Sequence, residues 1–342
     1  MLDIVVTHYL EPWDVGEKLF RMIALQRCVA FPYIHVKIVN DGGHRLPDNL
    51  FSEFPFTVEQ IDIPHGGVSA ARNAGIDHAD SPWIMFCDFD DTFANIYSLR
   101  EYMSVIAAAG DKMDMLWSRI LAEDYVDGKK LLYYVPEKQR FVFCHGKVYR
   151  TDFLKANRIR FDEELVFNED SCFNAVIIAH TPHQRIGEIN SPFPLYTWVR
   201  RESSVTNSGR EDEAEYGHFR RNLKVTEENR THRDREYYAG MVTRTVYDTF
   251  YMIFGRRISI RMKRKILEEF TPWIAERHEL LGETDEKTLD EIKTVAKMEL
   301  LEPGEFVADG IDLVKKWVDG LVKTYQKGGE NGEHCICERR QP

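Results

Sequence analysis

The sequence predicts an α/β fold built around a mostly parallel sheet. Stretches with strand composition alternate with stretches of helical period through the first ninety residues, which is the pattern of parallel α/β units. The predicted strands end in polar residues or glycines. One of them, residues 83–87, is apolar throughout, as expected for a strand covered on both faces.

The elements follow one another in a regular order. Residues 2–7 predict a first strand, and residues 15–29 an amphipathic helix. A second strand is predicted over 35–40 and a third over 57–63, and the glycine-opened stretch 68–76 predicts a helix. Ligands bind beyond the carboxyl ends of strands in open parallel sheets, so the residues that follow these strands are candidates for a binding site.

Three acids follow the apolar strand at Asp88, Asp90 and Asp91. Their mutual repulsion costs stability unless a cation or hydrogen-bond donors compensate it. Mg2+ or Mn2+, shared with the phosphates of a ligand, would provide that compensation. A solvated turn or a helix cap is the alternative interpretation of such a motif.

The predicted helix 68–76 begins after Gly66 and Gly67 and carries Arg72 one turn in. Its first backbone amides and the positive end of its dipole are suited to phosphate. A surface arginine without a ligand is the alternative for Arg72.

Composition favours a soluble cytoplasmic protein. The chain has 342 residues, six cysteines without a Cys-x-x-Cys pair, and a formal net charge of -11. These features argue against a zinc framework, a secreted disulfide scaffold and nonspecific binding to nucleic acid or anionic lipid. We expect neither a signal peptide nor a membrane-spanning segment, although peripheral association with a membrane stays open.

Four motifs occur in order: Val-Val-Thr-His-Tyr9, Val-Asn-Asp-Gly-Gly43, Gly-Gly-Val-Ser-Ala-Ala-Arg-Asn-Ala-Gly75 and Phe-Cys-Asp-Phe-Asp-Asp91. This set resembles the nucleotide-sugar half of family 2 glycosyltransferases. The resemblance implies the glycosyltransferase A-type fold, a Rossmann-like domain with a mixed, mostly parallel sheet. The family often has Pro-Thr-Tyr-Asn after the first strand and Asp-Gly-Ser after the second, and this chain departs from both.

The resemblance also implies roles for individual residues. Thr7 and Tyr9 would lie along the nucleoside, Asp41 would recognise base or ribose, and Arg72 would face base or pyrophosphate. Within the Asp-x-Asp motif, Asp88 would meet ribose or metal and Asp90 would be the principal metal ligand.

Motifs in the second hundred residues extend the resemblance. Gly-Lys-Val-Tyr-Arg150 is similar to a family element before the acceptor-side helix. Beside it, His145 is a candidate for the metal or the sugar and Lys147 for phosphate, and packing roles are the alternatives. Residues 113–121 predict one strand, and Asp127-Gly128 a turn between two strands.

The pair Glu169-Asp170 precedes an apolar helix predicted over 171–179. One interpretation of acids in the first turn of a helix is that they cap the helix and have no catalytic role. An inverting glycosyl transfer needs a carboxylate near the acceptor hydroxyl, and we assign that base to Asp170, with Glu169 orienting it or contacting a sugar. Arg201 resembles a family arginine and would stabilise the leaving diphosphate; a surface salt bridge is its alternative.

The remaining sequence differs in character. We predict a catalytic domain over 1–210, a helical region over 211–330 and a flexible tail over 331–342, with residues 208–216 as a linker or lid. The helical region would shape the acceptor site or form a homo-oligomer. Its basic run from Arg256 to Lys265 suits a solvated helix face or a surface that binds a polyanion or a membrane. Cys335 and Cys337 alone are too few ligands to assign a metal site.

The expected function is therefore a metal-dependent (Mn2+ or Mg2+), inverting glycosyltransferase that uses a nucleotide-diphosphate sugar, most simply a UDP-sugar. Its acceptor would be a hydroxyl of a glycan, a lipid-linked carrier or another glycoconjugate. Two alternatives remain: an enzyme acting on hydroxymethylated bases of DNA, and a noncatalytic subunit that binds sugar nucleotides.

Overall fold

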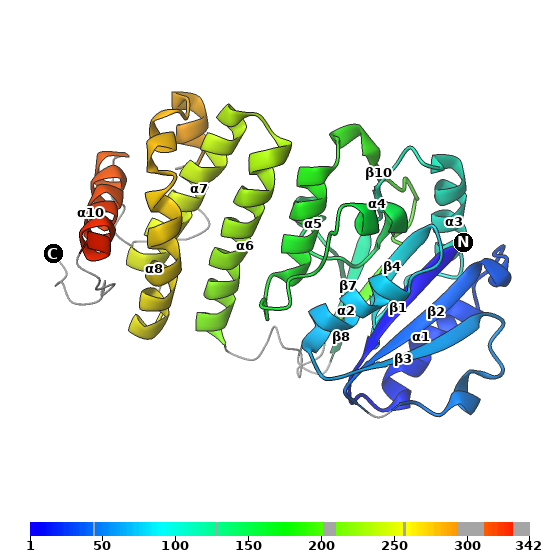
Figure 1. The fold of residues 1–342 in the computed structure, drawn as a ribbon. Coiled ribbons are helices and arrows are strands. Elements are labelled where there is room, and N and C mark those ends of the chain that lie inside the picture. The colour runs from blue at the N-terminus through cyan, green and yellow to red at the C-terminus, as the bar shows by residue number, and fades with distance from the viewer. Residues whose placement is uncertain (44, 127–128, 201–209, 256–257, 293–310, 331–342) are drawn as a thin grey trace. The chain divides into compact units, whose positions relative to one another are not determined.

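In the computed structural model the chain forms two compact units, Met1–Gly209 and Arg210–Pro342 (Figure 1). The structure describes the chain apart from residues 44, 127–128, 201–209, 256–257, 293–310 and 331–342. The predicted boundary after residue 210 lies beside this division. The predicted Asp127-Gly128 turn and the predicted tail with its two cysteines fall outside the described residues.

The first unit contains a seven-stranded sheet with the strand order β10-β6-β9-β4-β1-β2-β3. In that order the strands are Ile186–Glu188, Met115–Trp117, Lys147–Arg150, Trp83–Asp88, Leu2–His8, Ile34–Asp41 and Thr57–Ile63. All neighbours pair in parallel except β9, which is antiparallel to both β4 and β6. The predicted mixed, mostly parallel sheet is confirmed.

Helices cover both faces of this sheet (Figure 1). They are α1 (Trp13–Ala24), α2 (Gly67–His78), α3 (Ser98–Ala109), α4 (Thr151–Ala156) and α5 (Glu169–His180). In β4, Met85 and Cys87 belong to the core shared with α1 and α3. Phe86 points to the opposite face, where its ring contacts Phe161 and Phe173. This alternation is the pleat of a strand buried on both sides.

The prediction of a single strand over 113–121 is wrong, because the strand is interrupted at Ser118 and continues only from Ile120. The Ser118 amide donates to the Gly146 carbonyl at 2.9 Å, and its hydroxyl donates to the same oxygen at 3.0 Å. After β6 the chain therefore enters a second sheet, which the sequence did not predict. Its order is β5-β11-β7-β8, formed by Thr92–Phe93, Tyr196–Val199, Ile120–Val126 and Lys129–Tyr134.

The second unit is helical. Its helices are α6 (Glu211–His232), α7 (Arg235–Phe254), α8 (Ile260–Ala275) and α10 (Ile311–Glu330), with a 3-10 helix η6 (His278–Gly282). Val242, Val246, Phe250 and Ile253 recur at helical spacing along α7 and lie in the core of this unit. In the part of the chain that the structure describes, no helix combines the length and apolarity needed to cross a bilayer.

The linker or lid predicted over 208–216 is wrong from residue 211 onward, because α6 already begins there. Glu211, Asp212 and Glu213 occupy its first turn, where negative side chains interact favourably with the helix dipole. The acidity that suggested a linker is thus a helix start. Residues 208 and 209 lie outside the described part of the chain.

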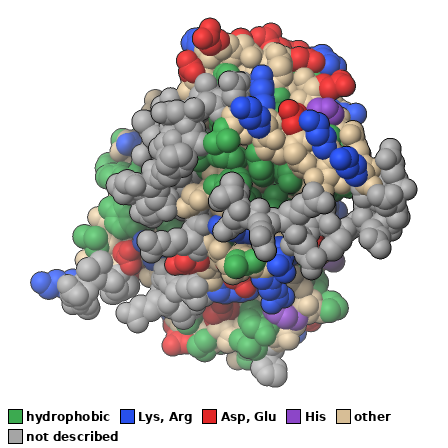
Figure 2. Space-filling view, turned by 90° about the vertical axis from the view of Figure 1, so that its left-hand side faces the viewer, with side chains coloured by type: hydrophobic (Ala, Val, Ile, Leu, Met, Phe, Trp, Pro, Cys, Tyr) green, Lys and Arg blue, Asp and Glu red, His purple; other side chains and the backbone are tan. Residues whose placement is uncertain are grey.

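The described part of the basic run belongs to α8, where Arg261, Arg264 and Lys265 are exposed. Acidic residues follow directly at Glu268 and Glu269. On the face shown in Figure 2, basic and acidic side chains are interspersed among apolar ones. A solvated helix face accounts for the described part of this run.

We predict that close packing of α2 on β1 limits position 75. A Cβ atom on Gly75 would lie 2.4 Å from Val5 Cγ1. Gly75→Ala should therefore lower the free energy of unfolding of the first unit by about 1–3 kcal/mol, because the methyl group forces helix and sheet apart. Urea unfolding followed by tryptophan fluorescence measures the change.

The matched control is Gly320→Ala in α10, where a Cβ atom would meet nothing within 4 Å. There alanine should leave stability unchanged or raise it by up to ~1 kcal/mol, because it favours helix. Equal effects of the two substitutions would contradict the close approach at Gly75.

Candidate functional site

The candidate site lies at the carboxyl ends of β1 and β4. The strand order reverses direction at β1, because β2 pairs on one side of it and β4 on the other. Thr7 and Asp88 face each other in the register of these strands, and the Thr7 hydroxyl donates to Asp88 Oδ1 at 3.3 Å. Such a reversal is where open α/β sheets form a ligand crevice.

Arg72 connects the two halves of the site. Its side chain is only 2% exposed, and its guanidinium reaches from α2 to β4 and to the start of α5. Nη2 donates to Asp88 Oδ1 at 3.1 Å. Nη1 donates to Asp170 Oδ1 at 2.5 Å and to Glu169 Oε1 at 3.1 Å. One cation thus holds three carboxylates that come from segments far apart in the sequence.

Electrostatics in this cluster are strongly perturbed. Burial by itself would lower the pKa of Arg72, but the carboxylates of Asp170, Asp88 and Glu169 keep it well above its usual range. Burial would raise the pKa of Asp88, yet His145 and Arg72 hold it well below the ordinary value. Asp88 therefore carries a negative charge at neutral pH, as a ligand of a cation requires.

Glu169 and Asp170 open α5. Asn168, the preceding residue, adopts the left-handed conformation with φ 66°, which turns the chain into the helix beside Arg72. Asp170 Oδ2 accepts a hydrogen bond from the Cys144 amide at 3.0 Å. Burial and the neighbouring Asp170 raise the pKa of Glu169 to about 7, although Arg72 opposes this shift.

His145 lies on the other side of Asp88. Its Nε2 is 3.1 Å from Asp88 Oδ2 and 3.8 Å from Asp91 Oδ2. Burial would lower the pKa of His145, but Asp88 and Asp91 raise it to about 9. The ring is parallel to that of Tyr196, with centroids 5.6 Å apart. This packing fixes the plane of the imidazole.

Asp91 is a member of the site that sequence reasoning did not assign. Its carboxylate accepts from the Tyr196 hydroxyl and from the Val199 amide, each at 2.7 Å, and it is 1% exposed. Burial, with Asp88 and Asp90 nearby, raises its pKa to about 8. The third acid of the motif was the available signal, but its neighbours come from β11 and were invisible in the sequence.

The donor atoms of this site fit a hard divalent cation. Asp88, Asp91 and His145 each offer one ligand atom, and these atoms lie within 4.8 Å of one another. Carboxylate oxygen and imidazole nitrogen suit Mn2+, and carboxylates also suit Mg2+. Asp90, predicted as the principal ligand, is half-buried and is not one of these three residues.

Lys147 is placed under the site rather than at its surface. It is 1% exposed, and its ammonium donates to the backbone carbonyls of Phe143 and, at 3.4 Å, His145. Burial lowers its pKa to about 8. In this arrangement Lys147 supports the turn that carries His145. A contact with phosphate stays a prediction.

Asp41 and Tyr9 lie at the ends of β2 and β1. The Asp41 carboxylate accepts from the amides of Gly66 and Gly67 at 2.7 and 2.9 Å. We predicted from the sequence that the first amides of α2 suit a phosphate. In the structure the amides of Gly66 and Gly67 donate to Asp41 instead. Tyr9 is 41% exposed. Arg201 falls outside the described residues, so its role stays a prediction.

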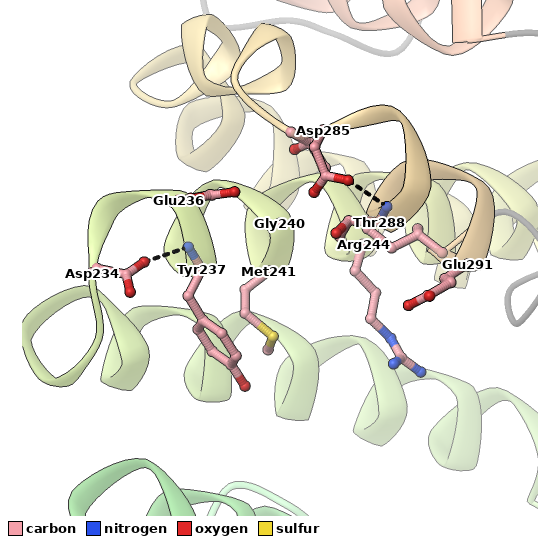
Figure 3. A pocket seen from close by; sticks show the side chains of 11 residues that line it. Asp234, Glu236, Tyr237, Gly240, Met241, Arg244, Asp285, Thr288 and Glu291 are labelled. Atoms are coloured by element: carbon pink, nitrogen blue, oxygen red, sulfur yellow. Dashed lines mark hydrogen bonds between the residues drawn. The ribbon is translucent and has the colours of Figure 1, made fainter.

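A separate cavity of about 470 Å3 occurs in the helical unit. It lies between α7 and the helical residues 286–292, and Figure 3 shows Tyr237, Met241 and Arg244 beside it. Asp234 and Asp285 on its rim accept hydrogen bonds from the amides of Tyr237 and Thr288. None of the residues predicted for catalysis or donor binding lines this cavity.

Residues 3–155 match a family model described as glycosyl transferase family 2. The teichoic acid poly(glycerol phosphate) polymerase of Staphylococcus epidermidis is 26% identical over 219 residues. That match covers 57% of this chain and 30% of the relative, so the chain spans less than a third of the length of that protein.

Solved structures share the fold. The crystal structure of S. aureus TarS 1–349 in complex with UDP has a TM-score of 0.60 and 15% sequence identity, covering 99% of this chain and 94% of that one. The structure of TarS 1–349 in complex with UDP-GlcNAc has a TM-score of 0.59 and 18% sequence identity, and the match covers 97% of this chain and 92% of that one. The predicted glycosyltransferase A-type fold with a helical C-terminal region is confirmed.

We predict that Arg72 is essential for stability. Arg72→Met leaves the buried Asp170 and the partly buried Asp88 and Glu169 without their cation, and the free energy of unfolding should fall by about 3–5 kcal/mol. Arg100→Met is the control, because Arg100 pairs with Glu101 at the surface and such pairs contribute little. Urea unfolding of both variants tests this, and equal midpoints would contradict a structural role for the buried cluster.

Proposed function

Because its N-terminal unit belongs to glycosyltransferase family 2, we propose that this protein transfers a sugar from a nucleotide-diphosphate donor to an acceptor hydroxyl with inversion. UDP-sugars are the proposed donors, and UDP and UDP-GlcNAc, which TarS binds in the structures above, are the first ligands to test. A divalent cation is proposed to take part.

One observation carries this proposal: the same guanidinium binds Asp88 and Asp170. The resemblance gives Asp88 to the donor and its metal, and Asp170 to the acceptor. Their separation in the sequence is 82 residues, yet Arg72 contacts one through each of its terminal nitrogens, at 3.1 and 2.5 Å. The residue proposed for the donor and the residue proposed as base are thus bound by one side chain, which supports the proposal because a single displacement requires donor and acceptor to be held close together.

The proposed reaction is a direct displacement. The acceptor oxygen bonds to the anomeric carbon while the bond from that carbon to the diphosphate oxygen breaks, and the diphosphate leaves with the bonding electrons. Asp170 takes the hydroxyl proton as general base. Arg72 and the Cys144 amide hold its carboxylate in place, so that base and acceptor are aligned before the proton moves.

Asp88 and Asp90, with His145, would hold the cation, whereas the Asp91 carboxylate already accepts from the Tyr196 hydroxyl and the Val199 amide. When bound, Mn2+ or Mg2+ supplies positive charge to the leaving diphosphate. His145 binds a metal only as a neutral imidazole. Since the neighbouring carboxylates raise its pKa to about 9, a bound cation would displace the proton that these carboxylates favour.

The acceptor is proposed to be a hydroxyl of a glycan or glycopolymer. The name of the Staphylococcus epidermidis relative refers to teichoic acid poly(glycerol phosphate), and a glycopolymer of that chemical class is therefore a reasonable first acceptor. A DNA acceptor and a noncatalytic sugar-nucleotide-binding subunit stay as alternatives. Release of UDP from UDP-sugars, with and without acceptor, separates the enzyme from the binding subunit.

We expect Asp170→Asn to reduce kcat by about 100- to 10,000-fold, because the amide cannot accept the acceptor proton. Binding of UDP with Mn2+, measured by calorimetry, should be unchanged, since Asp170 belongs to the acceptor side. Asp14→Asn, at an exposed acid in the first turn of α1, is the control. Full activity of the Asp170 variant would assign the base elsewhere.

The two adjacent acids Asp90 and Asp91 should respond differently to substitution. Asp90→Ala is expected to abolish the Mn2+-dependent rise in melting temperature caused by UDP, because it removes a carboxylate proposed as a metal ligand. Asp91→Ala should instead lower the stability of the unliganded protein by about 1–3 kcal/mol, because the Tyr196 hydroxyl and the Val199 amide lose their buried acceptor.

Thermal shift with UDP, Mn2+ or both measures each effect. An Asp90 variant that responds like the unaltered protein would remove Asp90 from the metal site. If no nucleotide-sugar or UDP raises the melting temperature of the unaltered protein, the proposed function itself is contradicted.

A further inference from the structure

Three loops meet beyond the carboxyl ends of β1, β2 and β3, which are adjacent in the sheet (Figure 1). They carry Tyr9, Gly42 with Gly43, and His65. The Tyr9 and His65 rings are stacked, with centroids 4.6 Å apart and planes inclined by 23°. Both remain accessible: Tyr9 is 41% exposed and the His65 side chain 59% exposed.

His65 is held from below by Asp41. Its Nδ1 lies 3.0 Å from Asp41 Oδ2, and Asp41 also accepts from the Gly66 and Gly67 amides that begin α2. Asp41 is only 5% exposed. The imidazole is therefore attached to a buried carboxylate and to the start of a helix, whereas Tyr9 follows the last residue of β1 on an exposed loop.

The glycines after β2 make this approach possible. Gly42 has φ +71°, and a Cβ atom there would lie 2.6 Å from the His65 Cβ. A Cβ atom on Gly43 would lie 1.5 Å from the Tyr9 carbonyl oxygen. Any side chain at position 43 would force the Tyr9 loop away. Tyr9 and Gly43, which both differ from the usual family residues, are thus parts of one contact.

Building on the proposed function, we infer that His65 is a positioning residue for the donor: it supports the inner face of the Tyr9 ring, whose other face stacks on the planar base of the nucleotide. Stacking on an aromatic ring is strongest when the ring is already fixed, because less freedom is lost on binding. His65 acts through Tyr9 and touches no reacting atom.

The test compares two ligands that differ in the base. UDP with Mn2+ carries a base, and pyrophosphate with Mn2+ does not. By calorimetry, Tyr9→Ala should weaken UDP binding about tenfold, the order of one lost base–aromatic stack, and His65→Ala about fivefold. Neither substitution should change the affinity for pyrophosphate. With a UDP-sugar that is turned over, His65→Ala should raise KM and leave kcat within about twofold.

A double-mutant cycle separates positioning from an independent contact. If His65 acts through Tyr9, the combined Tyr9→Ala and His65→Ala variant binds UDP no more weakly than Tyr9→Ala alone. His65→Phe, which keeps a ring beneath Tyr9, should retain the affinity for UDP. His78→Ala is the matched control, because His78 is also an exposed histidine and lies at the far end of α2, the helix that begins after His65.

Additive losses in the cycle, or a His65→Ala variant that binds UDP normally, would overturn the inference while leaving the proposed function intact. Equal weakening of UDP and pyrophosphate binding would also overturn it, since the base would then not be involved. Unaltered protein that binds neither ligand would contradict the proposed function instead.

Discussion

A single buried guanidinium is the constraint on which the candidate site depends. The Arg72 side chain is almost completely removed from water, and ion pairs with Asp88, Glu169 and Asp170 replace the lost solvation. Taking so many charges out of water is costly, and attraction offsets that cost only when the geometry is good. The helix, the strand and the start of α5 are therefore held at fixed positions by the same contacts that would position donor and acceptor.

Much of the parallel half of the fold could be predicted, because its signals are local. The apolar run of β4 and the two glycines at the start of α2 can be recognised from hydrophobic periodicity and composition alone. The break at Ser118 could not be predicted, since it depends on a hydrogen bond to Gly146, 28 residues away. The acidic residues Glu211, Asp212 and Glu213 illustrate a second limit, because the same composition suits a solvated linker and the first turn of a helix.

The sequence predicts most residues of the candidate site, but it does not predict which residues they contact. A run of acids after a buried strand and an acidic pair before an apolar helix can be recognised from residue type alone. Which of the acids meets a donor depends on tertiary structure. Asp91 is tied to Tyr196 and Val199 on β11, and Asp41 is engaged by the first amides of α2. Those contacts decide which carboxylates are already hydrogen-bonded within the protein.

Departures from a family pattern have to be considered together when their residues touch. Tyr9 and Gly43 differ from the usual family residues on two different loops, and each alone weakens the resemblance. In the structure the Tyr9 carbonyl occupies the space that a side chain at 43 would need, so one departure accommodates the other. His65 then fills the place beside them and is linked to Asp41. The loops after β1 and β2 are consequently a self-consistent variant of the family pattern, because steric fit and hydrogen bonding agree there.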